Sequence, residues 1–192
     1  MSDMPGVDYL EAYMGRVQVA IAAVDAGAME LFATRIDDTV ASGGYVFFIG
    51  NGGSASTATH YVNDLVMAYA RTNRVVRAVS LTDNPALVTG ISNDYSFDEV
   101  FSFQLRALSH PGDMVVAISA SGNSPNLIRA FEFARSSGLT TAAVVGFDGG
   151  TLKALADLTI HAPTGMGDYG PAEDVHLIIN HAVAGLIRAR GE

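Results

Sequence analysis

The sequence contains no cysteine, and only 11 of its 192 residues are lysine or arginine. Without cysteine the chain has no disulfide framework, no thiolate zinc site and no thiol nucleophile. The 20 acidic residues bring the formal net charge to −9, and a field of that sign repels nucleic acid and anionic membranes. We therefore expect no nucleic-acid partner. A small anionic metabolite is compatible with this charge, because backbone amides at a helix N-terminus attract an anion locally.

Long hydrophobic runs are absent as well. The longest uncharged stretch near the N-terminus, residues 17–24, is too short to span a bilayer and contains Gln18. The N-terminal residues MSDMPGVDYLE are acidic, whereas a signal peptide begins with basic residues. The sequence predicts a soluble protein of the cytoplasm with no membrane partner.

Helical periodicity dominates the first 42 residues. Apolar side chains recur at steps of three and four, from Leu10 to Ala28 and again from Phe32 to Val40. The second stripe ends at residues 42–44 (SGG), a typical helix stop. This apolar surface packs either on the protein's own core or on another subunit, and the sequence leaves both open.

From residue 45 onward, short apolar runs alternate with helical patterns. The predicted strands are residues 45–49, 75–81, 114–118, 142–147 and 158–161, and the predicted helices lie near 54–70, 84–91, 97–108, 124–137, 150–156 and 173–189. Continuous apolar strands separated by helices are typical of a parallel sheet buried on both faces. We predict one domain over residues 1–192, with a helical N-terminal extension (1–43) and an α/β core (44–192).

Two loops rich in glycine and serine each follow a predicted strand and lead into a predicted helix. They are GNGGSAS at 50–56 and SASGNSP at 119–125. In doubly wound sheets, ligands bind beyond the carboxyl ends of the strands, where glycine lets the backbone approach and a helix N-terminus offers N–H groups. Pro125 suits the first turn of the second helix, which makes Ser124 its expected N-cap.

Neither loop has the pattern of a nucleotide-binding motif. The chain has no Gly-Lys-Ser/Thr and no Gly-x-Gly-x-x-Gly, so we expect no nucleotide cofactor. The loops are either ordinary turns and helix caps, or a site that holds a single phosphoryl group with hydroxyls and amides. Two such loops on neighbouring strand ends favour the phosphoryl site.

Carboxylates and imidazoles gather on two predicted helices. Helical spacing places His60 and Asp64 on one face, and Glu173, His176 and His181 share the C-terminal helix. Carboxylate with imidazole suits proton transfer near neutral pH, and the same groups are zinc ligands. The alternatives are an ordinary surface pair for the first two residues and a core or interface position for His176.

The spacing of Glu173 and His181 raises a geometric difficulty. Eight residues span about 12 Å of an ideal helix, so both side chains cannot easily contact one small group. Either Glu173 belongs to a non-helical lead-in around 163–172, or the two residues serve the sites of different subunits.

The chain as a whole resembles the SIS (sugar isomerase) domain family, of the sedoheptulose 7-phosphate isomerase or phosphoheptose isomerase type. The similar segments are GNGGSASTATHYVNDL (50–65), SNDYSFDEVFSFQL (92–105), PGDMVVAISASGNSPNLIRA (111–130), GFDGGTLKALAD (146–157) and EDVHLIINH (173–181). With the helical N-terminus, the resemblance covers nearly the whole chain and makes residues 1–192 a single SIS domain.

This resemblance implies a flavodoxin-like SIS fold, with a five-stranded parallel sheet flanked by helices. It also implies a homotetramer whose active sites lie between subunits, with the substrate phosphate on the second, serine-rich loop. The substrate-binding residues expected on this basis are Asn51, Gly52, Ser54, Asp94, Ser119, Ala120, Ser121 and Ser124.

The catalytic His-x-x-x-Glu pattern of the family falls on His60 and Asp64, and its glutamine–histidine pair falls on Glu173 and His181. The resemblance implies that Asp64, Glu173 and His181 are catalytic. Some members hold zinc with all four positions, which makes these residues a candidate zinc site. The chain departs from the family at Asp64, which replaces a glutamate, at Glu173, which replaces a glutamine, and at Ala120, which replaces a threonine.

The implied activity is an aldose–ketose isomerase that converts sedoheptulose 7-phosphate to a D-glycero-heptose 7-phosphate by enediol(ate) proton transfer. Asp64 or Glu173 would move the proton, with His181 as the acid–base partner. The alternatives are an isomerase of another ketose phosphate and a non-catalytic SIS protein that binds a replication initiator. A sugar-phosphate sensor would need an attached DNA-binding domain, for which 192 residues leave no room.

Overall fold

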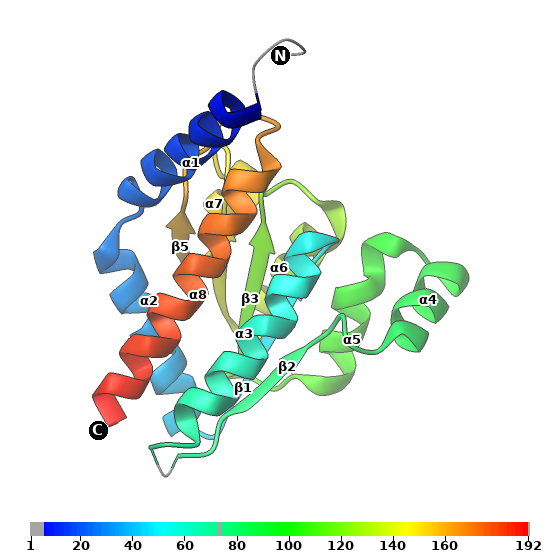
Figure 1. Cartoon of the computed structure of the whole chain (residues 1–192). Coiled ribbons are helices and arrows are strands. Elements are labelled where there is room, and N and C mark those ends of the chain that lie inside the picture. The colour runs from blue at the N-terminus through cyan, green and yellow to red at the C-terminus, as the bar shows by residue number, and fades with distance from the viewer. Residues whose placement is uncertain (1–5, 73, 192) are drawn as a thin grey trace.

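Five parallel strands form the sheet of this protein, in the order β2-β1-β3-β4-β5 (Figure 1). The computed structural model describes residues 6–72 and 74–191. The strands are β1 (Tyr45–Gly50), β2 (Arg77–Ser80), β3 (Met114–Ser119), β4 (Thr140–Val145) and β5 (Leu158–His161). The prediction of a five-stranded parallel sheet flanked by helices is confirmed.

Helices connect the strands and extend the chain at both ends. They are α1 (Gly6–Ala22), α2 (Ala26–Ala41), α3 (Gly53–Tyr69), α4 (Pro85–Asp94), the 3-10 helix η1 (Phe97–Glu99), α5 (Val100–Leu108), α6 (Pro125–Ser136), α7 (Gly150–Leu155) and α8 (Tyr169–Gly191). Figure 1 shows α3 and α8 packed side by side on one face of the sheet.

The central strands are apolar along their length because helices cover both faces of the sheet. On β1, Val46 and Phe48 belong to a core shared with α2, α3 and α8. Phe47 and Ile49 belong to a second core, shared with α5, α6 and α7. Gly50, the last residue of β1, pairs with Ile118, the residue before the last of β3. The two strands therefore end at nearly the same level, and the loops that follow them lie next to each other.

Several predicted boundaries differ from the observed ones, among them those of β2 and of the helix before β3. The strand expected at 75–81 is shortened to β2, and Val75 is 82% exposed beside it. The helix expected at 97–108 is divided into η1 and α5. Ser96 causes part of this change, because its hydroxyl accepts a hydrogen bond from the Asp98 N–H and caps η1 instead of a longer helix.

The two N-terminal helices bury very different amounts of apolar surface. Phe32 and Ile36 of α2 are fully buried, so the second predicted stripe covers the protein's own core. In α1 only Ala20 is buried, whereas Leu10 and Met14 are 59% and 55% exposed. Packing of this exposed face on another subunit stays a prediction, as does the division of one domain into extension and core.

No single helix within 6–72 and 74–191 is both long and apolar enough to cross a membrane. By length and composition alone, α1 and α2 pass that test as a pair, with a 67° bend between them.

Asp113 ties together the amino-terminal edge of the sheet. Its buried carboxylate accepts hydrogen bonds from the N–H groups of Tyr45 (2.7 Å) and His110 (2.8 Å). Asp113→Ala leaves both amides unpaired, so we expect the free energy of unfolding in urea to fall by about 2–5 kcal/mol. The control is Asp38→Ala, an exposed carboxylate 3.9 Å from Arg35, which should change it by less than about 0.5 kcal/mol. Equal effects of the two substitutions would contradict the role given to Asp113.

Candidate active site

A polar pocket of about 140 Å³ lies where the two loops leave the carboxyl ends of β1 and β3. We call it the serine pocket. The residues of both loops and of α8 that line it are Asn51, Ser54, Ser119, Ala120, Ser121, Ser124, Tyr169 and Glu173. All predicted substrate-binding residues except Gly52 and Asp94 therefore surround one pocket. Tyr169 carried no signal in the sequence.

A pair of asparagines holds the first loop against α6. Asn51 and Asn126 exchange two hydrogen bonds of 2.9 Å, each amide donating to the other's carbonyl oxygen. At the start of this loop, a Cβ on Gly50 would lie 2.6 Å from the backbone oxygen of Ser54, so only glycine fits there. Asn126 was not among the site residues predicted from the sequence, and its one signal there is a polar residue on the buried face of an amphipathic helix.

Hydroxyl groups shape the second loop. Ser119 Oγ accepts a hydrogen bond from the Gly122 N–H (3.0 Å), and Ser121 Oγ accepts one from the Asn123 N–H (3.3 Å). Ser124 occupies the N-cap position of α6, as predicted, but its side chain makes no capping hydrogen bond. Its hydroxyl therefore remains available to an anion in the serine pocket, next to the N-terminus of α6.

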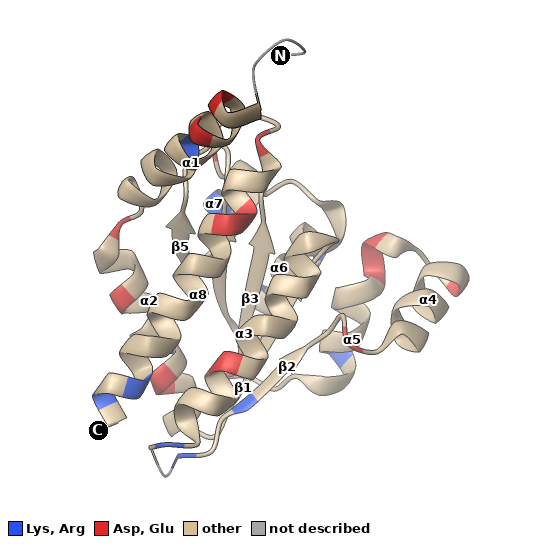
Figure 2. Cartoon of the chain, viewed as in Figure 1, with Lys and Arg blue, Asp and Glu red and all other residues tan. Residues whose placement is uncertain are grey.

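Glu173 brings a carboxylate to the same pocket. A Cβ on Gly53 would overlap the Glu173 carboxylate, so this group rests directly against the first turn of α3. Negative charge is stabilised at that position by the dipole of α3. Figure 2 shows the matching pattern along α8, with acidic residues near its beginning and basic residues at its end.

Glu173 lies inside α8, because this helix begins at Tyr169. The expectation of a non-helical lead-in is therefore wrong from residue 169 onward. In Figure 1, α3 and α8 run side by side in the same direction. Residues early in α3 therefore contact residues early in α8, and later residues contact later ones. Gly53 meets Glu173 at one level, and His181 lies about 12 Å further along α8. In one chain, Glu173 and His181 thus belong to different groups.

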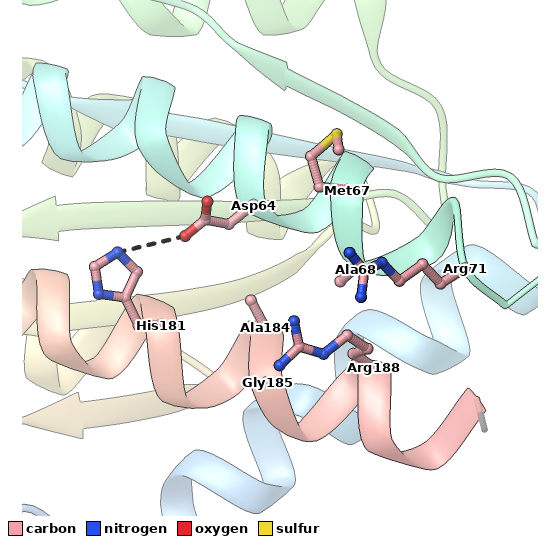
Figure 3. Close-up of a pocket in the computed structure, with 8 residues that line it drawn as sticks. All are labelled: Asp64, Met67, Ala68, Arg71, His181, Ala184, Gly185 and Arg188. Atoms are coloured by element: carbon pink, nitrogen blue, oxygen red, sulfur yellow. Dashed lines mark ion pairs between the residues drawn. The ribbon is translucent and has the colours of Figure 1, made fainter.

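His60 and Asp64 of α3 meet His181 of α8 in a second group, the histidine cluster. Asp64 Oδ2 lies 3.3 Å from His60 Nε2 and 3.6 Å from His181 Nε2, and the two imidazole nitrogens are 3.1 Å apart. Figure 3 shows Asp64 and His181 facing each other across the gap between the helices. A cavity of about 270 Å³ adjoins them and is lined by Asp64, Met67, Ala68, Arg71, His181, Ala184, Gly185 and Arg188.

The histidine cluster has the donor set of a metal site. One atom each of His60, Asp64 and His181 lie within 4.8 Å of one another. Bond lengths of 2.0–2.1 Å place the ligand atoms of tetrahedral zinc about 3.3 Å apart, and the three observed separations are 3.1, 3.3 and 3.6 Å. The residues present therefore fit a divalent metal ion. Within the described part of a single chain, Glu173 does not join them as the fourth ligand.

Gly52 and Asp94 lie outside the lining of the serine pocket. Gly52 is the N-cap residue of α3, exposed and at φ 54°, directly beside the pocket. Asp94 ends α4, where its exposed carboxylate accepts a hydrogen bond from Asn93 Nδ2 (2.8 Å). Within one chain, Asp94 joins neither the serine pocket nor the histidine cluster.

The fold and the two loops define a doubly wound α/β protein with a polar pocket at its strand ends, the place where ligands bind in such sheets. Residues 8–146 match the family model of the SIS domain. The chain belongs to the SIS domain family, and the resemblance found in its sequence is confirmed.

Curated relatives and two solved structures are of one type within this family. The chain is 38% identical to the phosphoheptose isomerase of Chlorobaculum parvum, over 92% of this chain and 85% of that protein. It is 34% identical to the phosphoheptose isomerase of Paramagnetospirillum magneticum, over 94% and 95% of the two chains. The structure of the phosphoheptose isomerase from Neisseria gonorrhoeae has a TM-score of 0.84 at 29% identity, covering 95% of this chain and 96% of that one.

Ser124→Ala separates ligand binding from helix capping. Because the hydroxyl makes no capping bond, we expect the free energy of unfolding to change by less than about 0.5 kcal/mol. Affinity for a sugar phosphate, measured by calorimetry, should fall about tenfold through the loss of a hydrogen bond to a charged group. Ser136→Ala, at the other end of α6, is the control and should keep the wild-type affinity. An unchanged affinity in Ser124→Ala would remove this hydroxyl from the site.

His176 is a core residue, in agreement with one of its two predicted alternatives. It is 0% exposed, and within the described chain neither ring nitrogen has a hydrogen-bond partner. Burial lowers the pKa of His176 to about 4. The Val145 backbone, which approaches the ring without reaching hydrogen-bond geometry, partly offsets this effect. The imidazole is therefore neutral in the folded protein at neutral pH.

This burial makes stability fall as the solution becomes acidic. The folded pKa of about 4 lies below the ordinary 6.5, so the unfolded chain takes up the proton first. The contribution of neutral His176 is complete above pH 6.5 and is lost as the pH falls toward 4. In urea unfolding across this range, His176→Leu should have a flatter pH dependence than the wild type. His110→Gln, a change at an exposed histidine, should keep the wild-type slope; parallel curves for all three proteins would refute the assignment.

Proposed function

We propose that this protein is a sugar-phosphate isomerase of the phosphoheptose isomerase type, which converts sedoheptulose 7-phosphate to a D-glycero-heptose 7-phosphate. The observation that carries the proposal is the serine pocket, which combines the hydroxyls of Ser121 and Ser124 with the carboxylate of Glu173. Relatives that bear this name, at 34% and 38% identity over more than nine-tenths of the chain, support it.

The serine pocket binds the phosphate end of the sugar. The hydroxyls of Ser119, Ser121 and Ser124 and the N-terminus of α6 supply neutral donors and a partial positive charge. Asn51 and Ser54 contact the adjoining sugar hydroxyls. Binding energy at this remote end positions the carbons that react.

The reacting carbons are at the opposite end of the sugar from the phosphate, so the reaction needs groups beyond the serine loop. We propose a homotetramer in which the histidine cluster of one subunit completes the serine pocket of another. Asp94 would reach the sugar in the same way. The exposed apolar face of α1, with Leu10 and Met14, supports an assembly of this kind.

Proton transfer through an enediol(ate) needs a base and an acid near the carbonyl. Asp64 or Glu173 takes the proton from the carbon beside the carbonyl and returns it to the former carbonyl carbon. His181 is the acid–base partner, for ring opening or for the carbonyl oxygen. The two imidazoles have the access that this requires, because the side chains of His60 and His181 are 41% and 55% exposed.

Zinc is the metal that the histidine cluster is proposed to hold. His60, Asp64 and His181 would be its ligands, with Glu173 of a neighbouring subunit as the fourth. A bound zinc ion would supply Lewis-acid polarisation of the carbonyl oxygen. In that case His60 serves as a ligand and orients the carboxylate of Asp64.

Ala120 favours a second candidate, an isomerase of another ketose phosphate. This residue is 5% exposed and lines the serine pocket with a methyl group, where a hydroxyl would have been a further donor. This apolar surface suits a ketose phosphate that has fewer hydrogen-bonding groups beside its phosphate.

The test of the reaction is NMR of the purified protein with sedoheptulose 7-phosphate in deuterated water, with and without zinc. We expect new aldose anomeric signals and deuterium beside the carbonyl. Asp64→Asn and Glu173→Ala should lose this turnover while keeping the wild-type unfolding midpoint. Full activity in both variants would overturn the assignment of the base. Binding of the sugar without any reaction would favour another ketose phosphate, and then a non-catalytic binding protein.

Mixed oligomers test whether two subunits form each site. Asp64→Asn impairs the histidine cluster and Glu173→Ala the serine pocket, so neither homo-oligomer should be active. If each site joins two subunits, unfolding and refolding the two proteins together should restore on the order of a quarter of the wild-type activity. No recovery in mixtures shown by mass spectrometry to contain both subunits would contradict the shared site.

A further inference from the structure

Asn180 is a buried polar residue of α8 that has no role in the site described so far. Its side chain is 1% exposed, on a helix face otherwise made largely of apolar residues such as Ile179 and Val183. The amide Nδ2 donates a hydrogen bond of 2.7 Å to Asp64 Oδ2. The carbonyl Oδ1 has no hydrogen-bond partner within the described residues.

The orientation of this amide follows from the chemistry of its partner. An ionised carboxylate only accepts hydrogen bonds, so Nδ2 must face Asp64 and Oδ1 must face the core. A buried oxygen without a partner disfavours the folded state, and an apolar side chain of the same size would avoid this penalty. This penalty offsets the hydrogen bond that Asn180 donates to Asp64, so the residue adds little net stability, and its amide is explained by what it does to Asp64.

Asp64 Oδ2 is the atom that the whole histidine cluster shares. It faces His60 Nε2 at 3.3 Å and His181 Nε2 at 3.6 Å, and Asn180 approaches the same atom from the buried side. The other oxygen, Oδ1, accepts a hydrogen bond of 3.0 Å from Asn63, an exposed residue. The aspartate side chain can rotate, and a donor held in the core between α3 and α8 prevents that rotation.

We propose that Asn180 is a positioning residue, whose buried amide holds Asp64 Oδ2 between the two imidazoles in the geometry that binds a divalent metal ion. The inference rests on the proposed function of the histidine cluster. Groups that orient a metal ligand typically change metal affinity by about 10- to 100-fold when they are removed.

The test compares zinc affinity with stability in the full-length chain. For Asn180→Leu we expect an affinity about 10- to 100-fold lower, measured by competition with a chromophoric chelator. The urea midpoint of the metal-free protein should change little, because the lost hydrogen bond to Asp64 and the removal of the unpaired oxygen offset each other. Turnover should fall through kcat with little change in KM, since Asn180 does not line the serine pocket. If Asn180→Leu does not fold, Asn180→Ala removes the same amide without adding bulk.

Two further variants make the outcomes distinct. Asn63→Ala removes the exposed amide on the other oxygen, and its zinc affinity should fall by less than about threefold. His60→Ala removes a ligand and should abolish zinc binding. Wild-type affinity in Asn180→Leu and Asn180→Ala, together with loss of binding in His60→Ala, would overturn the positioning role and leave the cluster intact. A wild-type protein that neither binds zinc nor isomerises the sugar would overturn the proposed function and this inference with it.

Discussion

The packing of α8 along α3 is the contact on which both candidate groups depend. The buried side chains of these helices include Tyr61, Leu65, Ile179 and Val183, each at most 1% exposed. Burial of such side chains contributes about 1.5–3 kcal/mol each, which holds the pair of helices firmly in one register. Because the helices run in the same direction, that register decides two things at once. It sets the Glu173 carboxylate against the first turn of α3, and it brings His181 to Asp64.

The sheet supplies the second constraint. Strands β1 and β3 are neighbours and end at nearly the same level, so two loops that are far apart in sequence form one pocket. The reciprocal bonds between Asn51 and Asn126 then fix the first loop to the helix that follows the second. The serines of these loops thus belong to a rigid frame, which is what orientation of a small phosphorylated ligand requires.

Local patterns predicted the elements well where local forces decide them. Apolar runs located the strands, and the boundaries of β5 and of most helices agree within a few residues, because periodicity and turn residues act over short distances. The prediction of Ser124 as the N-cap residue of α6 is confirmed, although its side chain makes no capping hydrogen bond. The start of the C-terminal helix was predicted near residue 173, whereas α8 begins at Tyr169. The start of a long helix depends on its packing as much as on glycine and proline.

By itself, the sequence determined the class of fold, the family and the identity of the chemical groups, because these follow from hydrophobic period, loop composition and motif order. Only the tertiary structure decided how the groups are distributed. It separated Glu173 from His181 and left Asp94 apart from both groups. It placed His176 in the core. It also showed that Asn126 is the partner of Asn51 and that Asn180 is the partner of Asp64. The physical reason is that such contacts join residues 75 to 116 positions apart in the chain, and their geometry depends on helix register and strand order, which no local pattern contains.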